Sequence, residues 1–258
     1  MSVAAAFSKG RPALMGYLPA GFPTVKEGIA AIQAMIESGV DLVEVGLPYS
    51  DPVIDGPVIQ RATEKALAGG VRTRDVLQTV EAVASGGVPV MVMTYWNPVD
   101  RYGVNAFARD LKAAGGAGMI TPDLIPDEAE QWLAASDEHK LDRVFLVSPS
   151  STDERIAMTV SACRGFIYAT AVMGVTGARE QTSSAAPKLV ARIKAITDLP
   201  VGVGLGVRDA SQVAEVGSYA DAVIVGSALV TALGEKGEQG VRDLTAHLAS
   251  GLPQAPAT

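Results

Sequence analysis

Short runs of β-branched and other apolar residues alternate with longer amphipathic stretches along the whole chain. The amphipathic stretches have helical spacing, as for Ile29, Ile32, Met35 and Ile36. A strict alternation of strand and helix predicts a parallel sheet covered by its own crossover helices. We predict strands at residues 13–18, 41–46, 88–94, 117–121, 143–148, 165–170, 200–204 and 221–226.

The number of strand–helix units decides between two α/β architectures. Eight units in 258 residues is what a closed (β/α)8 TIM barrel needs. The competitor is a doubly wound open sheet, but no G-x-G-x-x-G follows the first predicted strand. No low-complexity linker divides the chain. We therefore predict one (β/α)8 barrel domain over residues 1–258, with a frayed tail from about residue 250.

Charge, cysteine count and the length of apolar runs restrict the classes of partner and the compartment that we expect. The net charge of −7 and the sequence pI near 4.9 argue against nucleic acid and against an anionic membrane surface. The single cysteine permits no internal disulfide. No apolar run is long enough for a signal peptide core or a bilayer span. We expect a soluble cytoplasmic protein.

Residue types that often carry catalysis are missing from the places where a barrel would need them. A barrel site is built at the C-terminal ends of the strands and in the loops that follow. His139 and His247 both fall in predicted helices, and Cys163 precedes the sixth strand. No lysine closes a strand at its C-terminal end. The residues that a zinc site, a Ser-His-Asp relay or a Schiff-base lysine would need are therefore not found at the strand ends. This leaves carboxylates and phenols for proton transfer.

The stretch "LVEVGLPYSDPVIDGP" (42–57) supplies the carboxylate candidates. Burial at a strand mouth would raise the pKa of Glu44 and make it an acid near neutral pH, although spacing alone equally allows a structural ion pair with an arginine. For Asp51 and Asp55, spacing alone favours turn chemistry, since Asp-Gly and Asp-Pro are common turn pairs. Tyr168 ends the sixth strand, and from its position alone the default interpretation is a core tyrosine with a satisfied hydroxyl.

Glycine-rich pieces follow three successive strands. They are "GVTG" (174–177), "GVGLG" (202–206) and "GSAL" (226–229), of which the last opens a helix. Loops after the seventh and eighth strands of a barrel often hold a phosphate together with a helix N-terminus. These pieces together predict a phosphate site. The long loop after strand six, "AVMGVTGAREQTSS", predicts a lid, with plain disorder as the alternative.

Four of these motifs together resemble the alpha subunit family of tryptophan synthase. They are "VEVGLPYSDPVIDGPVIQ", "MTYWNPV", "TPDLIPDE" and "GVTGARE", within a match that runs from "MGYLPAGFPT" to "AVIVGSALV". The resemblance implies a single (β/α)8 barrel that cleaves indole-3-glycerol phosphate to indole and glyceraldehyde 3-phosphate. It also implies a lyase without metal or organic cofactor. The implied partner is a pyridoxal-phosphate beta subunit that receives the indole in an alpha2beta2 heterotetramer.

The resemblance also assigns roles to individual residues. It implies Glu44 as the catalytic acid–base group and Asp55 as the catalytic carboxylate that holds the indole N–H. The family's pocket tyrosine falls on Tyr168. Substrate-binding positions fall on Thr176, Gly177, Leu205, Gly206, Gly226 and Ser227, with the phosphate contacts on the glycines and the serine. Four residues depart from the common pattern: Leu205 replaces a phenylalanine, Pro19 and Phe22 replace a threonine and an aspartate, and Met173 varies the lid.

Three other functions compete with this interpretation. A sugar-phosphate isomerase or epimerase would share the phosphate site but usually needs a strand-end histidine or lysine. A non-catalytic barrel that only activates a beta subunit would not need Glu44 and Asp55. A freestanding indole-3-glycerol phosphate lyase has the same site residues, so sequence alone does not separate it from a paired subunit.

Overall fold

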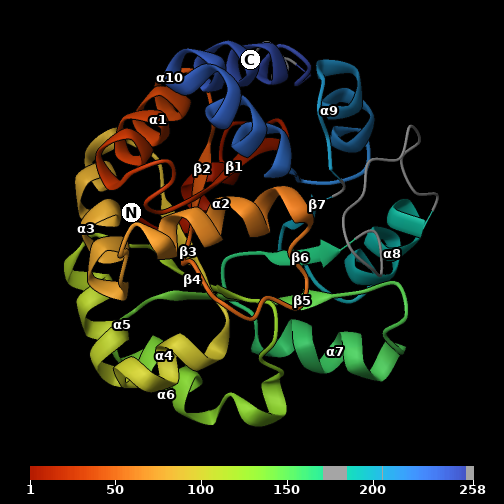
Figure 1. The fold of residues 1–258 in the computed structure, drawn as a ribbon. Helices are drawn as coiled ribbons and strands as arrows, with labels where there is room; N and C mark the ends of the chain where they lie inside the picture. The colour runs from red at the N-terminus through yellow and green to blue at the C-terminus, as the bar shows by residue number, and fades with distance from the viewer. Residues whose placement is uncertain (171–184, 205, 254–258) are drawn as a thin grey trace.

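In the computed structural model, eight parallel strands close into a barrel in the order β1-β2-β3-β4-β5-β6-β7-β8 (Figure 1). The structure describes residues 1–170, 185–204 and 206–253. The strands are β1 (Ala13–Pro19), β2 (Leu42–Gly46), β3 (Val90–Met93), β4 (Gly118–Thr121), β5 (Asp142–Val147), β6 (Ile167–Thr170), β7 (Val201–Gly204) and β8 (Ala222–Val225). All eight predicted strands are confirmed, with ends that differ by at most two residues, and so is the barrel.

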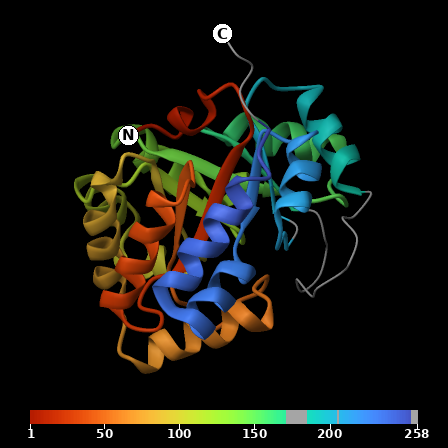
Figure 2. The same ribbon diagram turned by 90° about the horizontal axis from the view of Figure 1, so that it is seen from above.

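Helices enclose the strands on the outside of the barrel (Figures 1 and 2). The α-helices are α1 (Val25–Glu37), α2 (Pro57–Ala68), α3 (Thr73–Val83), α4 (Trp96–Tyr102), α5 (Val104–Ala113), α6 (Glu130–Glu138), α7 (Asp153–Ala162), α8 (Ala185–Lys194), α9 (Ala210–Gly217) and α10 (Ser227–Ala249). Short 3-10 helices are η1 (Val3–Phe7), η2 (Ala84–Gly86) and η3 (Pro126–Glu128). The prediction of one helix per strand is incomplete, because α2 and α4 are additional helices in the connections after β2 and β3.

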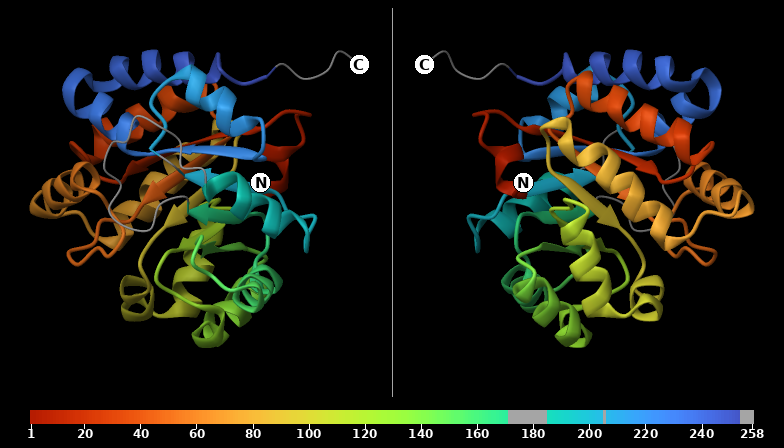
Figure 3. Two further views of the ribbon diagram at one scale, coloured as in Figure 1. Left: turned by 90° about the vertical axis from the view of Figure 1, so that its right-hand side faces the viewer. Right: turned by 90° about the vertical axis from the view of Figure 1, so that its left-hand side faces the viewer.

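Helix α2 lies at the carboxyl end of the barrel, beyond the arrowheads of the strands (Figure 3, left). Its sequence explains why it forms: Gly56 is the N-cap and Pro57 the first helical residue, a position where the missing N–H of proline costs nothing. The loop that carries Asp55 is therefore held at its C-terminal end by the first residues of α2. In the described part of the chain, no helix is long and apolar enough to cross a membrane.

Two apolar layers hold the barrel together. Inside it, side chains such as Met15, Leu42, Met91 and Phe166 form one buried cluster. A larger cluster lies between the strands and the helices and includes Trp132, which is fully buried on α6. Since each fully buried large side chain contributes about 1.5–3 kcal/mol, these two layers supply most of the driving force for closure.

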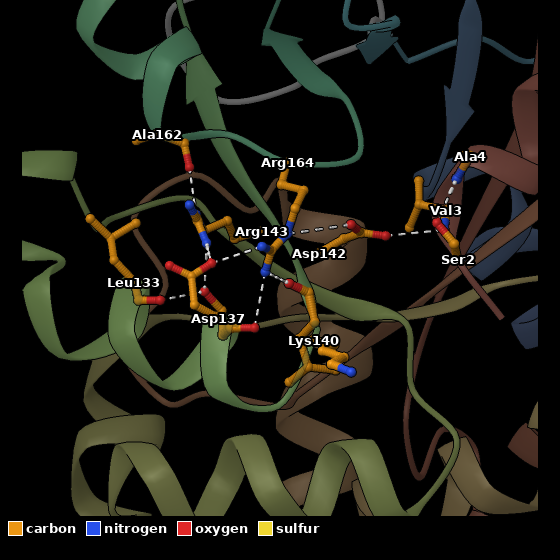
Figure 4. Close-up of polar contacts among 12 residues, drawn as sticks. Ser2, Val3, Ala4, Leu133, Asp137, Lys140, Asp142, Arg143, Ala162 and Arg164 are labelled. Carbon is orange, nitrogen blue, oxygen red and sulfur yellow. Dashed lines mark hydrogen bonds and ion pairs between the residues drawn. The ribbon is translucent and has the colours of Figure 1, made fainter.

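The amino end of the barrel is closed by η1 and by a network of charged side chains (Figures 3 and 4). Val3 is fully buried, and its backbone N–H donates to Asp142 Oδ2 of β5 at 3.1 Å. Arg143 and Arg164 both contact Asp137 Oδ1, at 2.6 and 2.7 Å. The network ties η1, α6 and β5 together at the end of the barrel opposite the strand carboxyl ends, so it serves stability and leaves the other end for chemistry.

Candidate active site

Glu44 lies on β2, two residues before the last strand residue, Gly46, and is 1% exposed. It pairs in register with Tyr17 on β1 and with Met91 on β3. Neither of its carboxylate oxygens has a hydrogen-bond partner among the described residues. Burial therefore raises the pKa of Glu44 from 4.5 to about 8. The described residues give Glu44 no arginine partner, so the alternative of a structural ion pair finds no support.

Two tyrosines extend from β1 and β6 into the same region as Glu44. A Cβ atom built on Gly46 would lie 2.3 Å from the Tyr17 hydroxyl, and one built on Gly204 would lie 2.7 Å from the Tyr168 hydroxyl. The two phenols therefore pack directly against the backbone of Gly46 and Gly204, where any larger residue would clash with them. Burial, and to a smaller extent the charges of Asp55 and Glu44, raises the pKa of both hydroxyls well above the usual value, so both stay protonated and can donate hydrogen bonds.

Asp55 belongs to the loop between β2 and α2. Burial raises the pKa of its carboxyl, and a hydrogen bond from Tyr95 acts in the opposite direction. The Asp55 backbone carbonyl accepts a hydrogen bond of 2.7 Å from Gln60 Nε2 on α2. Asp55 also affects the pKa of Tyr17 and Tyr168, which places its charge close to both phenols. Asp51, by contrast, is exposed and accepts a hydrogen bond from Ser50 Oγ at 2.5 Å, as a turn residue would.

The start of α10 follows directly on the carboxyl end of β8. Gly226 is the N-cap and makes no side-chain cap, and Ser227 is the first helical residue. The first N–H groups of a helix have no partner within the helix, so this end can accept an anion. The ring of Tyr17 lies beside it, 3.4 Å from a Cβ built on Gly226. Gly206, after β7, has a φ of +75° that disfavours any larger residue.

The structure thus brings Glu44, Tyr168, Gly226 and Ser227 to the carboxyl ends of strands, as predicted, with Asp55 and Gly206 in the loops that follow. Thr176, Gly177 and Leu205 lie outside the described residues, as does the predicted lid. Pro19 ends β1. Phe22 is buried and packs near Gly234 of α10, with the Lys65 ammonium 5.5 Å from its ring centre.

Sequence reasoning missed Tyr17 and Tyr95 as site residues. Both stand in motifs that were recognised, "MGYLPAGFPT" and "MTYWNPV", but neither was given a role. For Tyr17 a signal existed, because it occupies an inward position of β1 near its carboxyl end, in register with Glu44. For Tyr95 no local pattern indicates that its hydroxyl reaches the loop after β2.

The two histidines and the cysteine lie on helices or at helix ends, away from the carboxyl ends of the strands. His139 follows α6 and His247 lies in the last turn of α10, where the sequence placed them. Cys163 ends α7, and burial raises the pKa of its thiol to about 12. A thiol held this way is a poor nucleophile.

Fold and site together place the chain in the class of (β/α)8-barrel enzymes, which build their sites at the carboxyl ends of the strands, here from carboxyl and phenol groups. Within that class the chain belongs to the tryptophan synthase alpha chain family, whose model matches residues 3–254. The tryptophan synthase alpha chain of Mycobacterium marinum is 65% identical over 247 residues, which cover 96% of this chain and 91% of the relative.

Solved structures agree with this assignment. A structure of Mycobacterium tuberculosis tryptophan synthase matches with a TM-score of 0.92 and 62% identity, covering 99% of this chain and 97% of the other. A mutant tryptophan synthase alpha-subunit from the hyperthermophile Pyrococcus furiosus matches with a TM-score of 0.85 and 31% identity, covering 92% and 98%. The resemblance read from the four motifs is confirmed.

Proposed function

We propose that this chain cleaves indole-3-glycerol phosphate to indole and glyceraldehyde 3-phosphate by carboxyl acid–base catalysis. The observation that carries the proposal is Glu44: a buried carboxyl at the strand mouth, without a hydrogen-bond partner among the described residues and with a pKa near 8. Such a group is protonated at neutral pH and close enough to its pKa to exchange that proton with a substrate. An unpaired polar group of this kind costs stability and is typical of a functional site.

The reaction requires two proton movements around one C–C bond. Glu44 donates its proton to the indole carbon that bears the glycerol chain, which makes the ring cationic and spreads charge toward its nitrogen. Asp55 accepts a hydrogen bond from the ring N–H and stabilises that charge. The glycerol hydroxyl next to the bond then gives its proton to the Glu44 carboxylate as the C–C bond breaks. The electrons of the broken C–C bond return to the ring, the hydroxyl oxygen becomes the aldehyde oxygen, and Glu44 is protonated again.

The substrate lies between the two tyrosines in this proposal. Tyr168 and Tyr17 remain neutral in the pH range of the reaction, so they add hydrogen-bond donors and aromatic surface beside the carboxylates without adding charge. In this proposal Gly206, Gly226 and Ser227, together with Gly177, hold the phosphate mainly through backbone N–H groups. Thr176 is a further substrate contact, and Leu205 lines the indole pocket. This arrangement suits an acidic chain, which offers no general attraction for an anion.

Membership in the family supports proposals for a partner and a compartment. We propose that the chain works as one barrel domain in the cytoplasm and pairs with a tryptophan synthase beta subunit in an alpha2beta2 assembly. The exposed apolar side chains of Val53 (72% exposed) and Ile54 (37%) directly precede Asp55 and are available to such a partner. An isomerase is disfavoured because His139 and His247 both lie away from the strand carboxyl ends.

Indole release from indole-3-glycerol phosphate, measured with and without a beta subunit, tests the function directly. We expect slow release by the isolated chain and a rise of at least about 10-fold on binding, because a partner that orders the Asp55 loop removes the cost of selecting its competent conformation. Full activity that the partner leaves unchanged would instead indicate a freestanding lyase. Activation of the beta subunit with no indole release would indicate a non-catalytic barrel.

A further inference from the structure

Tyr95 lies between β3 and α4, but its hydroxyl points toward the loop that connects β2 to α2. It is the N-cap of α4 and 5% exposed. Thr94 Oγ1 donates to the Tyr95 carbonyl at 2.9 Å, and the N–H of Trp96 donates to the Asp123 carboxylate at 2.9 and 3.1 Å. Backbone contacts on both sides therefore set where the Tyr95 ring stands.

The Tyr95 hydroxyl contacts three consecutive residues of the loop after β2. The backbone N–H groups of Val53 and Ile54 each donate to the Tyr95 oxygen, both at 3.2 Å. The Asp55 side chain lies near enough to this hydroxyl that the phenol proton lowers the pKa of the carboxyl. The two backbone N–H groups fill the acceptor positions of the phenol and leave its own proton for the Asp55 carboxyl. Mainly through burial, the pKa of Tyr95 is raised to about 12, so the proton that it donates is present throughout the working range.

The loop itself offers little apolar packing in this region. Val53 and Ile54 are exposed, so their side chains do not anchor the backbone that precedes Asp55. On the other side of Asp55, the hydrogen bond from Gln60 to its carbonyl fixes the backbone but leaves the carboxylate free to turn. Among the described residues, the group that acts on the Asp55 carboxyl itself is the Tyr95 hydroxyl.

We propose that Tyr95 is a positioning residue for Asp55: its hydroxyl holds the two backbone N–H groups that precede Asp55 and faces the Asp55 carboxyl, so that the loop presents this carboxyl to the substrate. This inference rests on the proposed function, in which ionised Asp55 holds the indole N–H. Among the described residues, the other titratable groups that share a charge interaction with Asp55 are Tyr17 on β1 and Tyr168 on β6; both are neutral and alike in wild type and variant.

Tyr95→Phe is the first test, measured by the pH dependence of indole release in the presence of the beta subunit. Phenylalanine keeps the ring that stacks on Tyr49, at 5.2 Å between centroids, and removes only the oxygen. We expect kcat/KM to fall by roughly 10- to 100-fold, as for loss of a hydrogen bond to a charged group. The hydrogen bond lowers the pKa of Asp55, so its loss should raise that pKa and move the acid limb of the pH profile to higher pH by about one unit.

Tyr49→Phe is the matched control, since it removes a hydroxyl from the other ring of the same stack and should leave the profile unchanged. Replacing Tyr95 by 3-fluorotyrosine keeps the ring and makes the phenol a stronger donor, so the acid limb should move to lower pH. A merely structural role for Tyr95 predicts no movement in either direction, and an unmoved limb in both folded variants would overturn the inference.

A double substitution separates this inference from the proposed function. If Tyr95 acts through Asp55, adding Tyr95→Phe to Asp55→Asn should cost less than about 3-fold beyond Asp55→Asn alone. If the losses of activity in the two single variants instead multiply in the double variant, Tyr95 acts elsewhere. That result would overturn the inference while Asp55 kept its role. Full activity of Asp55→Asn itself would instead refute the role of Asp55 in the proposed function.

Discussion

A Glu44→Gln variant is expected to release indole from indole-3-glycerol phosphate at least about 1,000-fold more slowly than the wild type, with the beta subunit present. Glutamine has the size of glutamate but neither donates a proton as an acid nor accepts one as a base. Both proton movements in the proposed reaction pass through this single carboxyl, so its loss removes two contributions at once. A folded variant that kept more than a few per cent of the wild-type kcat would refute the assignment.

The same variant carries its own folding control. Burial raises the pKa of Glu44 from 4.5 to about 8, so the folded chain keeps a proton that the unfolded chain releases above pH 4.5. The wild type therefore loses stability as the pH rises from about 4.5 to about 8, and glutamine removes this loss. At pH 7 the variant should be more stable by roughly 3 kcal/mol in urea unfolding, with a gap that narrows toward pH 5. Lost activity with gained stability is a combination that damage to the barrel does not produce.

A Ser227→Asp variant should raise KM for indole-3-glycerol phosphate by at least about 100-fold. Ser227 is the first residue of α10, where a carboxylate interacts favourably with the helix N-terminus, so the fold should tolerate the change. The new charge would stand where the substrate phosphate binds. Two like charges about 4 Å apart near a protein surface repel by about 4 kcal/mol. Charge at Ser227 is a cleaner probe than a bulky residue at Gly206, whose φ of +75° would strain any substitute.

Ser227→Asn is the matched control because it has the same shape without the charge, and its KM should change only a few-fold. A second comparison uses the dephosphorylated indole-glycerol, whose slow cleavage should respond equally little to both variants. Equal losses for aspartate and asparagine, or for both substrates, would show that the substitution disturbs the barrel and that the phosphate binds elsewhere.

The fold was predictable because its signals are local. Each strand is a short apolar run followed by a helix of clear periodicity, and the closed barrel follows from their number. Less predictable were α2 and α4, which lie within connections. Their sequences, "PVIQRATEKALA" and "WNPVDRY", are short, and propensity alone is a weak guide for helices of this length.

The place of a candidate site residue was predictable where it depends on the residue's position in one element. Glu44 near the end of β2 and Ser227 at the start of α10 are of this kind. Tyr95 and Tyr17 are not, because their importance depends on contacts between separate connections of the barrel. Spacing favoured a plain turn for Asp55, whereas its burial beside three phenols becomes visible only once the strands are closed.

Carbon-13 NMR of the glutamate side-chain carboxyls, followed through a pH titration, tests the central claim that Glu44 is an acid held neutral by burial. The account predicts one carboxyl signal that titrates near pH 8 and is missing from Glu44→Gln. A spectrum in which every glutamate, including Glu44, titrates near the ordinary value of about 4.3 would contradict it.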